Sequence, residues 1–392
     1  MISDPETVVE ERKSVAVQAL GEAWQDVLGI ATTLHEHPET AWQEHLAHRH
    51  LTELLEAWGF AVDARAGGLD TAFHARYGDG PLHVGFVAEY DALPGLGHAC
   101  GHNLIAAAAV GAALATRAAE PGITVHVLGT PAEEGGGGKI AMLDAGEFAE
   151  LDAAMMIHPG PADVAKADPF AVTHWRVGYR GVGAHAAAYP HLGVNAADAF
   201  TVAQVAIGLL RQQLPPDARV HGVVTAAGSA PNAIPDEAWG RWYVRAASLD
   251  RLTGLEQRVR ACFDAGALAT GCTLEVEPES PRYAEFRNDD QLLDLFVRNA
   301  AALGRDMTAA PPDGAGAMNT ASTDMGNVSQ VVPSIHPYLS IGSLPAVNHQ
   351  KQFADAAIGP LADDAVRDGA TAMAWTAIDL ADRRRTASSH QR

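Results

Sequence analysis

Alternating runs of strand-like and helix-like sequence are the feature that most limits the folds open to this chain. Two short β-like runs within residues 71–88 are followed by an alanine-rich helix predicted over 104–119. A buried strand predicted over 124–128, a helix that opens at Lys139 and a further strand over 153–157 continue the pattern. Strands that alternate with helices in this way indicate βαβ units. We therefore expect an α/β fold with a mixed, mostly parallel sheet.

The middle of the chain has a different order of predicted elements. Its predicted elements run strand, helix, strand, strand, helix, strand between residues 171 and 285. That order is typical of a ferredoxin-like α+β layer. We therefore divide the chain into a catalytic domain of residues 1–170 and 286–392 and an inserted domain of residues 171–285. The catalytic domain is expected to begin with helical sequence over 7–60 and to close with one long helix over 354–382.

The charge of the chain argues against one class of partner. Lysine and arginine number 27 and aspartate and glutamate 48, which gives a formal net charge of −21. Such a surface repels phosphate backbones, so we do not expect nucleic-acid binding. The longest nearly apolar run, 104–116, is too short to span a bilayer, so no membrane association is expected. The chain has only three cysteines, and its N-terminus shows no basic segment followed by an apolar one, the pattern of a secretory signal. Both features favour a reducing cytoplasm as the expected compartment.

Polar residues next to glycines follow the predicted strands. Open α/β sheets bind their ligands beyond the carboxyl ends of the strands, which is where these residues are expected. They are Glu89, Asp91, Cys100, His102, Glu133, Glu134, His158 and His349. Thiolate, imidazole and carboxylate together suit zinc or a similar divalent transition metal. Each residue alone has an ordinary explanation, such as a buried thiol, a turn histidine or a solvated glutamate. Their coincidence in one layer favours a metal centre.

Two segments of this set carry the chemistry. Cys100-Gly101-His102 places two ligand types just before a helix, whose amino end would favour the thiolate of Cys100. The adjacent Glu133 and Glu134 can divide their roles, because one carboxylate can bind metal while the other moves a proton.

The glycine run Gly135–Gly138 with Lys139 is not a phosphate loop. The phosphate-loop pattern needs serine or threonine after the lysine, and this chain has Ile140 there. Two acidic residues also precede the glycines and would repel phosphate.

Several segments, in the same order, resemble the dinuclear metallopeptidases of the aminoacylase and carboxypeptidase G type. Within that family the chain is similar to the amidohydrolase branch that uses a cysteine ligand, which includes aminobenzoyl-glutamate hydrolases and aminoacylase-1-like dipeptidases. The resemblance spans most of the chain. The matching segments are Asp91–Pro94, Gly97–Asn103, Pro131–Lys139, His158–Gly160, Gly183–Ala186, Pro231–Asp236 and His349.

The resemblance implies a two-metal centre and a role for each residue in it. Glu133 would act as general base and then as general acid, and Asp91 would orient a metal ligand. Cys100 would bridge two divalent metal ions, for which zinc, manganese and cobalt all fit. The residues that would hold these ions are Cys100, His102, Glu134, His158 and His349.

The resemblance also assigns roles to the inserted domain, which would be the dimerisation and lid domain of a homodimer. His185 would reach the active site of the partner subunit and polarise the scissile carbonyl, while Asn232 and Arg245 would bind the carboxylate of a small amide substrate. One position departs from the wider family, whose members carry a ligand histidine two residues before Asp91. This chain has Glu89 there. The cysteine-using branch commonly lacks that histidine, so the departure supports the branch and leaves the ligand set at one metal open.

The expected function is hydrolysis of the amide bond of an N-acyl amino acid, a dipeptide or an aminobenzoyl-glutamate-like compound by a metal-bridging hydroxide. Two other classes stay open at this point. One is a catalytically inactive homologue that binds a small molecule, and the other is a structural dimer with an incidental zinc site. The expected ligand set is complete, which weighs against an inactive centre.

Overall fold

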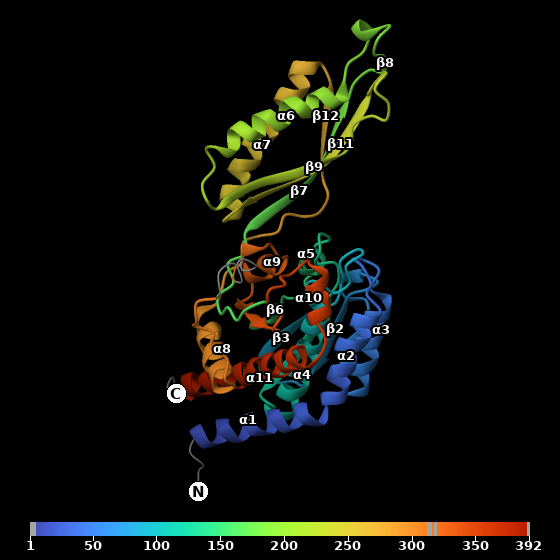
Figure 1. Cartoon of the computed structure of the whole chain (residues 1–392). Helices are drawn as coiled ribbons and strands as arrows, with labels where there is room; N and C mark the ends of the chain where they lie inside the picture. Colours follow the sequence, from blue (N-terminus) through green and yellow to red (C-terminus); the bar gives the residue numbers. More distant parts are fainter. Residues whose placement is uncertain (1–4, 312–315, 317–319, 390–392) are drawn as a thin grey trace. The chain divides into compact units, whose positions relative to one another are not determined.

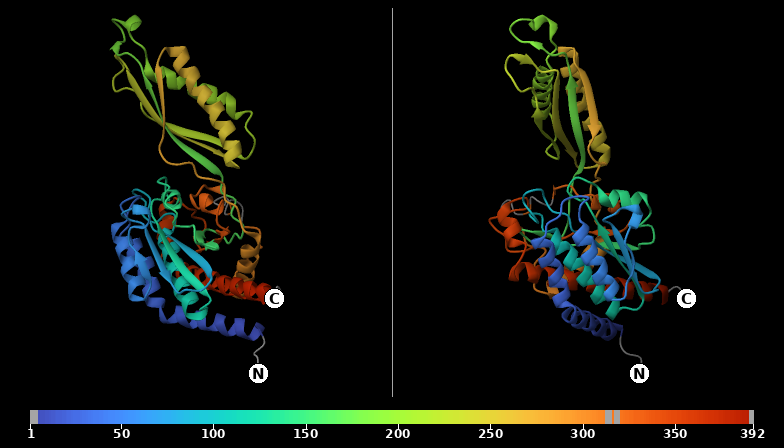
Figure 2. Two further views of the ribbon diagram at one scale, coloured as in Figure 1. Left: turned by 180° about the vertical axis from the view of Figure 1, so that it is seen from behind. Right: turned by 90° about the vertical axis from the view of Figure 1, so that its right-hand side faces the viewer.

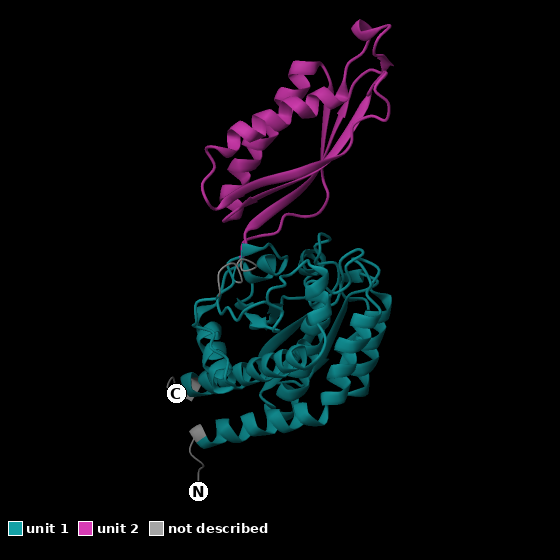
Figure 3. Cartoon of the chain, viewed as in Figure 1, with its two compact units in different colours: residues 1–168, 286–392 teal, residues 169–285 magenta. Residues whose placement is uncertain are grey.

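The computed structural model of the chain divides into two compact units (Figure 3). Residues 5–311, 316 and 320–389 are described. Unit 1 comprises Met1–Asp168 and Phe286–Arg392, and unit 2 comprises Pro169–Glu285.

Unit 1 is built around a six-stranded mixed sheet (Figure 1). Its strands are β1 (Ala61–Asp63), β2 (Phe73–Tyr77), β3 (Leu82–Glu89), β4 (Ile123–Thr130), β5 (Ala153–Met155) and β13 (Ser334–Ile335). The order is β1-β2-β4-β3-β5-β13, in which β4, β3, β5 and β13 run parallel and β2 is antiparallel to both of its neighbours, β1 and β4. A separate parallel pair is formed by β6 (His158–Gly160) and β14 (Tyr338–Ser340). The predicted α/β class with a mostly parallel mixed sheet is thus confirmed.

Helices cover both faces of this sheet. They are α1 (Pro5–Glu22), α2 (Trp24–Glu36), α3 (His45–Ala57), α4 (His102–Ala119), α5 (Gly138–Asp144), α8 (Asp290–Ala302), α9 (Met325–Ser329), α10 (Lys351–Ala356) and α11 (Pro360–Ser389). Helix α4 is central, since it packs on β3 and β4 and is itself covered by α1, α2 and α11 (Figure 1). Its many alanines are buried nearly along the whole helix, which lets these neighbours approach closely. The core therefore fixes the amino end of α4, where Cys100 and His102 lie.

Two of the helix predictions are corrected by the structure. The single closing helix predicted over 354–382 is wrong, because α10 and α11 are separate. Gly359 interrupts them with φ +104°, and Pro360 begins α11, where a missing N–H costs nothing. The predicted helical stretch 7–60 is three helices, and residues 37–44 between α2 and α3 are not helical.

Unit 2 is the predicted ferredoxin-like layer (Figure 2). Its elements are β7 (Ala171–Arg180), β8 (Ala184–His185), α6 (Ala196–Arg211), β9 (Ala218–Ala226), β10 (Ala233–Ile234), β11 (Glu237–Ala246), α7 (Leu249–Thr270) and β12 (Thr273–Pro278). The antiparallel sheet has the order β12-β7-β11-β9. Phe200 of α6 and Phe263 of α7 pack with Trp242 and Val244 of β11, so both helices bury one face of the sheet. The short pair β8 and β10 continues the β7–β11 ladder outward.

Candidate metal centre

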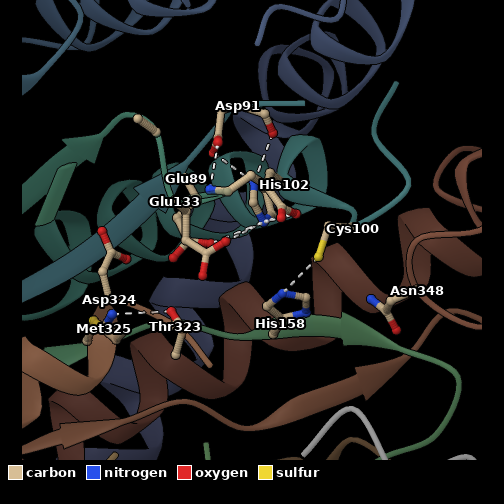
Figure 4. A network of polar contacts seen from close by, with 12 residues as sticks. Glu89, Asp91, Cys100, His102, Glu133, His158, Thr323, Asp324, Met325 and Asn348 are labelled. Carbon is tan, nitrogen blue, oxygen red and sulfur yellow. Dashed lines mark hydrogen bonds and ion pairs between the residues drawn. The ribbon is translucent and has the colours of Figure 1, made fainter. Parts of the chain in front are cut away.

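The predicted site residues of unit 1 gather at the carboxyl ends of the parallel strands (Figure 4). Glu89 is the last residue of β3, Glu133 follows β4, and His158 opens β6 just after β5. Cys100 and His102 stand at the amino end of α4. The strands run parallel, so these loops meet at one edge of the sheet, as expected for a ligand site in an open α/β fold.

The five expected metal ligands form two sets of donor atoms that share one residue. Cys100, His102 and His158 make one set, and Cys100, Glu134 and His349 make the other, with the donor atoms of each set within 4.8 Å of one another. The Sγ atom of Cys100 lies 3.7 Å from Nε2 of His158, and Nε2 of His349 lies 3.4 Å from Oε1 of Glu134. Cys100 therefore stands between the two sets.

Unusual backbone conformations hold these side chains in place. Gly101 has φ +82°, and a Cβ there would come within 2.8 Å of Cγ of Pro159, so the position between the two ligands accepts only glycine. Ala132, just before Glu133, and His349 are non-glycine residues with φ of 56° and 69°. The amide of His349 donates to the carbonyl of Ala99 at 2.8 Å. Strained residues of this kind cluster at functional sites, where the surrounding structure holds them.

Asp91 fixes the orientation of the His102 ring. The Nδ1 atom of His102 lies 2.9 Å from the carbonyl oxygen of Asp91 and 3.0 Å from its Oδ1, so Nδ1–H donates to both. The Oδ2 atom of Asp91 accepts from the amide of Glu134 at 3.0 Å. In the neutral ring Nε2 of His102 therefore carries the lone pair, and this atom is buried with no direct hydrogen-bond partner among the described residues. It faces Oε2 of Glu89 at 3.5 Å and Oε2 of Glu133 at 3.8 Å.

These donors fit a metal ion. A buried imidazole lone pair that faces carboxylate oxygens places electron-rich atoms against one another, and a positive charge between them, a proton or a metal ion, makes that arrangement favourable. A ligand histidine whose other ring nitrogen donates to a carboxylate is the usual arrangement at protein metal sites.

The electrostatics of the cysteine also suit a ligand. Burial raises the pKa of Cys100, and so does the charge of Glu134. The charge of His158 and hydrogen bonds from His102 and His158 outweigh both and lower it to about 6. A thiolate, the form that binds metal, is therefore accessible near neutral pH.

The pKa values of the two adjacent glutamates are shifted in opposite directions. Burial, and then the charges of Glu89 and Glu134, raise the pKa of Glu133 well above its usual range. Burial also opposes ionisation of Glu134, but its hydrogen bond with His349 and the charge of His102 lower its pKa. Two neighbouring carboxyl groups whose pKa values are pushed apart can take different roles, one as an anionic ligand and one as a proton carrier.

A buried lysine beside the donors was not predicted as a site residue. The Nζ atom of Lys139 is fully buried and lies 2.6 Å from Oε1 of Glu89 and 2.7 Å from Oδ1 of Asp324. Its amide donates to Oδ2 of Asp324 at 2.9 Å. Burial lowers the pKa of Lys139, but the charges of Asp324 and Glu89 outweigh it and raise the pKa. One oxygen of Glu89 is thus paired with a lysine while the other faces His102. The only signal in the sequence for Lys139 was a charged residue among small and apolar helix positions, and no sequence pattern singled out Asp324.

Comparison with known proteins shows the family to which the chain belongs. The model of the peptidase family M20/M25/M40 matches residues 85–363. A mouse Xaa-Arg dipeptidase is 41% identical over 95% of this chain and 89% of its own length. The chain belongs to the M20/M25/M40 peptidase family.

Two further relatives lie in the same family or share its fold. One subunit of the p-aminobenzoyl-glutamate hydrolase of Escherichia coli is 35% identical over 63% of this chain and 56% of its own length. A dinuclear metal-binding M20 peptidase of Bacillus subtilis superposes with a TM-score of 0.67 over 90% of this chain and 97% of its own, at 22% identity, which shows the shared fold.

Membership of the M20 family confirms the central prediction from sequence. The chain is a metal-dependent hydrolase of amide or peptide bonds. Among the described residues, no helix has both the length and the apolar character needed to cross a membrane.

The remaining predicted residues of this M20 chain lie in unit 2. His185, in β8, is exposed, and its Nδ1 accepts from the amides of Ala187 and Ala188 at 3.3 and 3.1 Å. An Nδ1 that accepts leaves Nε2 as the protonated nitrogen of the neutral ring. Asn232 is close by, because its carbonyl accepts from the amide of Ala186 at 2.9 Å and Ala233 pairs with His185.

Arg245 lies away from this pair. It is near the end of β11, where its Nε lies 3.3 Å from Nε2 of His221. Glu237, at the start of β11, is eight residues away, and β10 continues the ladder beyond it. At about 3.4 Å per residue, Arg245 is more than about 25 Å from Asn232. Unit 2 therefore does not bring Asn232 and Arg245 together.

Proposed function

We propose that this chain is a dipeptidase with two divalent metal ions held by Cys100, His102, Glu134, His158 and His349. The observation that carries the proposal is that two sets of donor atoms, each within 4.8 Å, share Cys100. Imidazole and thiolate donors favour zinc, with manganese and cobalt as the alternatives. A thiolate ligand needs a reducing compartment, so we place the protein in the cytoplasm.

The protein residues would then divide the chemistry among them. The bound ions would supply Lewis acidity to the amide carbonyl and to the attacking water. Glu133 would take a proton from that water and deliver it to the leaving amine. Positive charge nearby would lower the raised pKa of Glu133 toward neutrality, where a carboxyl both accepts and donates. Asp91 would hold His102 in the tautomer that directs Nε2 at the metal.

Unit 2 would complete the site in a homodimer. His185 presents an Nε2–H that suits a developing oxyanion, and Asn232 and Arg245 are suitable groups for a substrate carboxylate. Asn232 and Arg245 are too far apart in one chain to bind the same small molecule. We therefore propose that one subunit supplies Arg245 and the partner subunit supplies the other two side chains.

For the substrate we propose a dipeptide with a basic carboxyl-terminal residue. Two relatives near 40% identity over 95% of this chain, from mouse and human, are Xaa-Arg dipeptidases. The formal net charge of −21 also favours a cationic substrate over an anionic one. An aminobenzoyl-glutamate amide is the second candidate, favoured by the 35% identity to the Escherichia coli hydrolase.

The test is a hydrolysis panel with zinc, manganese or cobalt added back. It compares Xaa-Arg and Xaa-Lys dipeptides with Xaa-Glu dipeptides and p-aminobenzoyl-glutamate. The wild type is expected to cleave the basic dipeptides best. Glu133→Gln should keep its metal and lose about 10²–10⁴-fold in turnover, while Glu53→Gln, at an exposed position of α3, should behave as wild type.

The panel also separates the alternatives. Preference for p-aminobenzoyl-glutamate would move the assignment to the second candidate. Absence of cleavage with all three metals would refute the dipeptidase proposal. Full activity of Glu133→Gln would refute the role of that carboxyl.

A further inference from the structure

A row of three histidines crosses neighbouring strands of the unit 1 sheet. His74 is in β2, His126 in β4 and His83 in β3. Nε2 of His74 lies 2.8 Å from Nδ1 of His126, and Nε2 of His126 lies 3.0 Å from Nδ1 of His83. A glutamate stands at each end: Oε2 of Glu147 is 2.9 Å from Nδ1 of His74, and Oε2 of Glu150 is 3.9 Å from Nδ1 of His83.

This row is remote from the metal centre described above. His83 is near the start of β3, and Glu89 is its last residue. Six residues at about 3.3 Å each separate the two by about 20 Å. Val84 and Val125, the strand neighbours of His83 and His126, belong to the core that packs around α4. Side chains alternate along a strand, so the histidines point to the other face of the sheet.

The hydrogen bonds of the row have one direction when the rings are neutral. The carboxylate of Glu147 accepts, so Nδ1–H of His74 donates to it. A neutral ring has one N–H, so Nε2 of His74 accepts from Nδ1–H of His126. Nε2 of His126 is left with a lone pair directed at His83. His126 is buried, and burial disfavours the charged form of an imidazole.

A metal-ligating histidine has this same arrangement, with one nitrogen toward the metal and the other donating into a relay that ends on a carboxylate. Zinc binds imidazole nitrogen at about 2.0–2.1 Å, so neighbouring ligand atoms around a tetrahedral zinc lie roughly 3.4 Å apart. The 3.0 Å between His126 and His83 and the 3.9 Å between His83 and Glu150 bracket that value. The donor atoms of these three residues all lie within 4.8 Å of one another.

We propose that His83, His126 and Glu150 bind a divalent transition-metal ion of the zinc class at a site separate from the catalytic centre. The proton on Nδ1 of His83 moves to Nε2 when the ion binds, since this side chain is 23% exposed and water can solvate the new N–H. Glu150 also lines a surface hollow of about 470 Å³, together with His74 and Glu147, so the carboxylate end of the site is open to solvent. The ion would tie β3 and β4 to the segment after α5.

One neighbouring charge opposes the ion and gives the proposal a specific consequence. Nη1 of Arg76 lies 3.4 Å from Oε2 of Glu150 and competes for that carboxylate. Removal of this exposed arginine is therefore expected to tighten zinc binding, whereas removal of His83 or Glu150 abolishes it. A gain of affinity on losing a side chain is not expected from a general loss of structure.

The test uses the full-length protein and zinc ions alone, with zinc per chain measured by elemental analysis after equilibration against buffered zinc. Wild type is expected to hold one more ion per chain than His83→Gln or Glu150→Gln, and Arg76→Gln to hold that ion at lower free zinc. Cys100→Ala should keep this ion, because the proposal does not depend on the catalytic centre. His37→Gln, an exposed histidine of the same unit, is the matched control and should bind as wild type.

Equal zinc content in wild type and in Glu150→Gln would overturn the proposal, and that variant is safe for folding because Glu150 is exposed. Loss of the additional ion in Cys100→Ala would also overturn it, since the ion would then belong to the catalytic centre. Unchanged affinity in Arg76→Gln would contradict the role given to Glu150.

Discussion

Replacement of Asp91 by asparagine tests how the protein prepares His102 for a metal. Both carboxylate oxygens of Asp91 accept hydrogen bonds, one from Nδ1 of His102 at 3.0 Å and one from the amide of Glu134 at 3.0 Å. Asparagine has a single acceptor oxygen, so its NH₂ group must face one of these two donors. The variant therefore loses one charge-assisted hydrogen bond while the shape of the side chain is kept.

The expected effect is on metal affinity. Loss of a carboxylate partner behind a ligand histidine weakens metal binding by about 10–100-fold, which is about 1.4–2.7 kcal/mol. Competition with a chromophoric chelator measures this without a substrate. The matched control is Asp79→Asn, in the exposed connection between β2 and β3, which should bind metal as wild type. Wild-type metal affinity in Asp91→Asn would refute the role given to Asp91.

Three further predictions concern the metal, the buried lysine and pH. Cys100→Ala should lose metal from both donor sets, measurable as ions per chain; wild-type content at this centre would remove Cys100 as the shared ligand. Lys139→Met leaves two buried carboxylates without their cation and should lower the free energy of unfolding by about 3–5 kcal/mol. Its Tm should therefore be lower than that of the control Lys166→Met, which changes an exposed lysine. Equal Tm values for the two variants would contradict this. Burial, and then the charges of two arginines, lower the pKa of His174 to about 4. The folded protein therefore favours the neutral ring, and its contribution to stability is fully present above about pH 6.5. It is lost as the pH falls toward 4, because the unfolded chain binds the proton first. The loss is on the order of 3 kcal/mol, and His174→Gln should flatten the fall of Tm between pH 7 and pH 4.5; parallel curves would count against it.

The sequence predicted those parts of the site that follow from strand order. Parallel strands end at the same edge, so residues that follow β3, β4 and β5 had to meet once the βαβ pattern was recognised. Cys100, His102 and His158 were expected together for this reason, and their donor atoms lie within 4.8 Å of one another.

The parts that could not be predicted depend on tertiary contacts between distant segments. Lys139 and Asp324 are 185 residues apart, and no local pattern shows that they pair. The break between α10 and α11 was missed because the apolar pattern continues through Gly359, although that glycine and the following proline were visible. Asn232 and Arg245 were both predicted to bind the substrate carboxylate, but the length of β11 separates them within one chain.

Anomalous scattering from crystals grown with zinc tests the central claim most directly. The account predicts two zinc peaks per chain at this centre, about 3.5–4 Å apart, with Sγ of Cys100 in contact with both. The other ligands are expected to be His102, His158, Glu134 and His349. A single zinc, or two ions that do not share Cys100, would contradict the two-metal centre proposed for this protein.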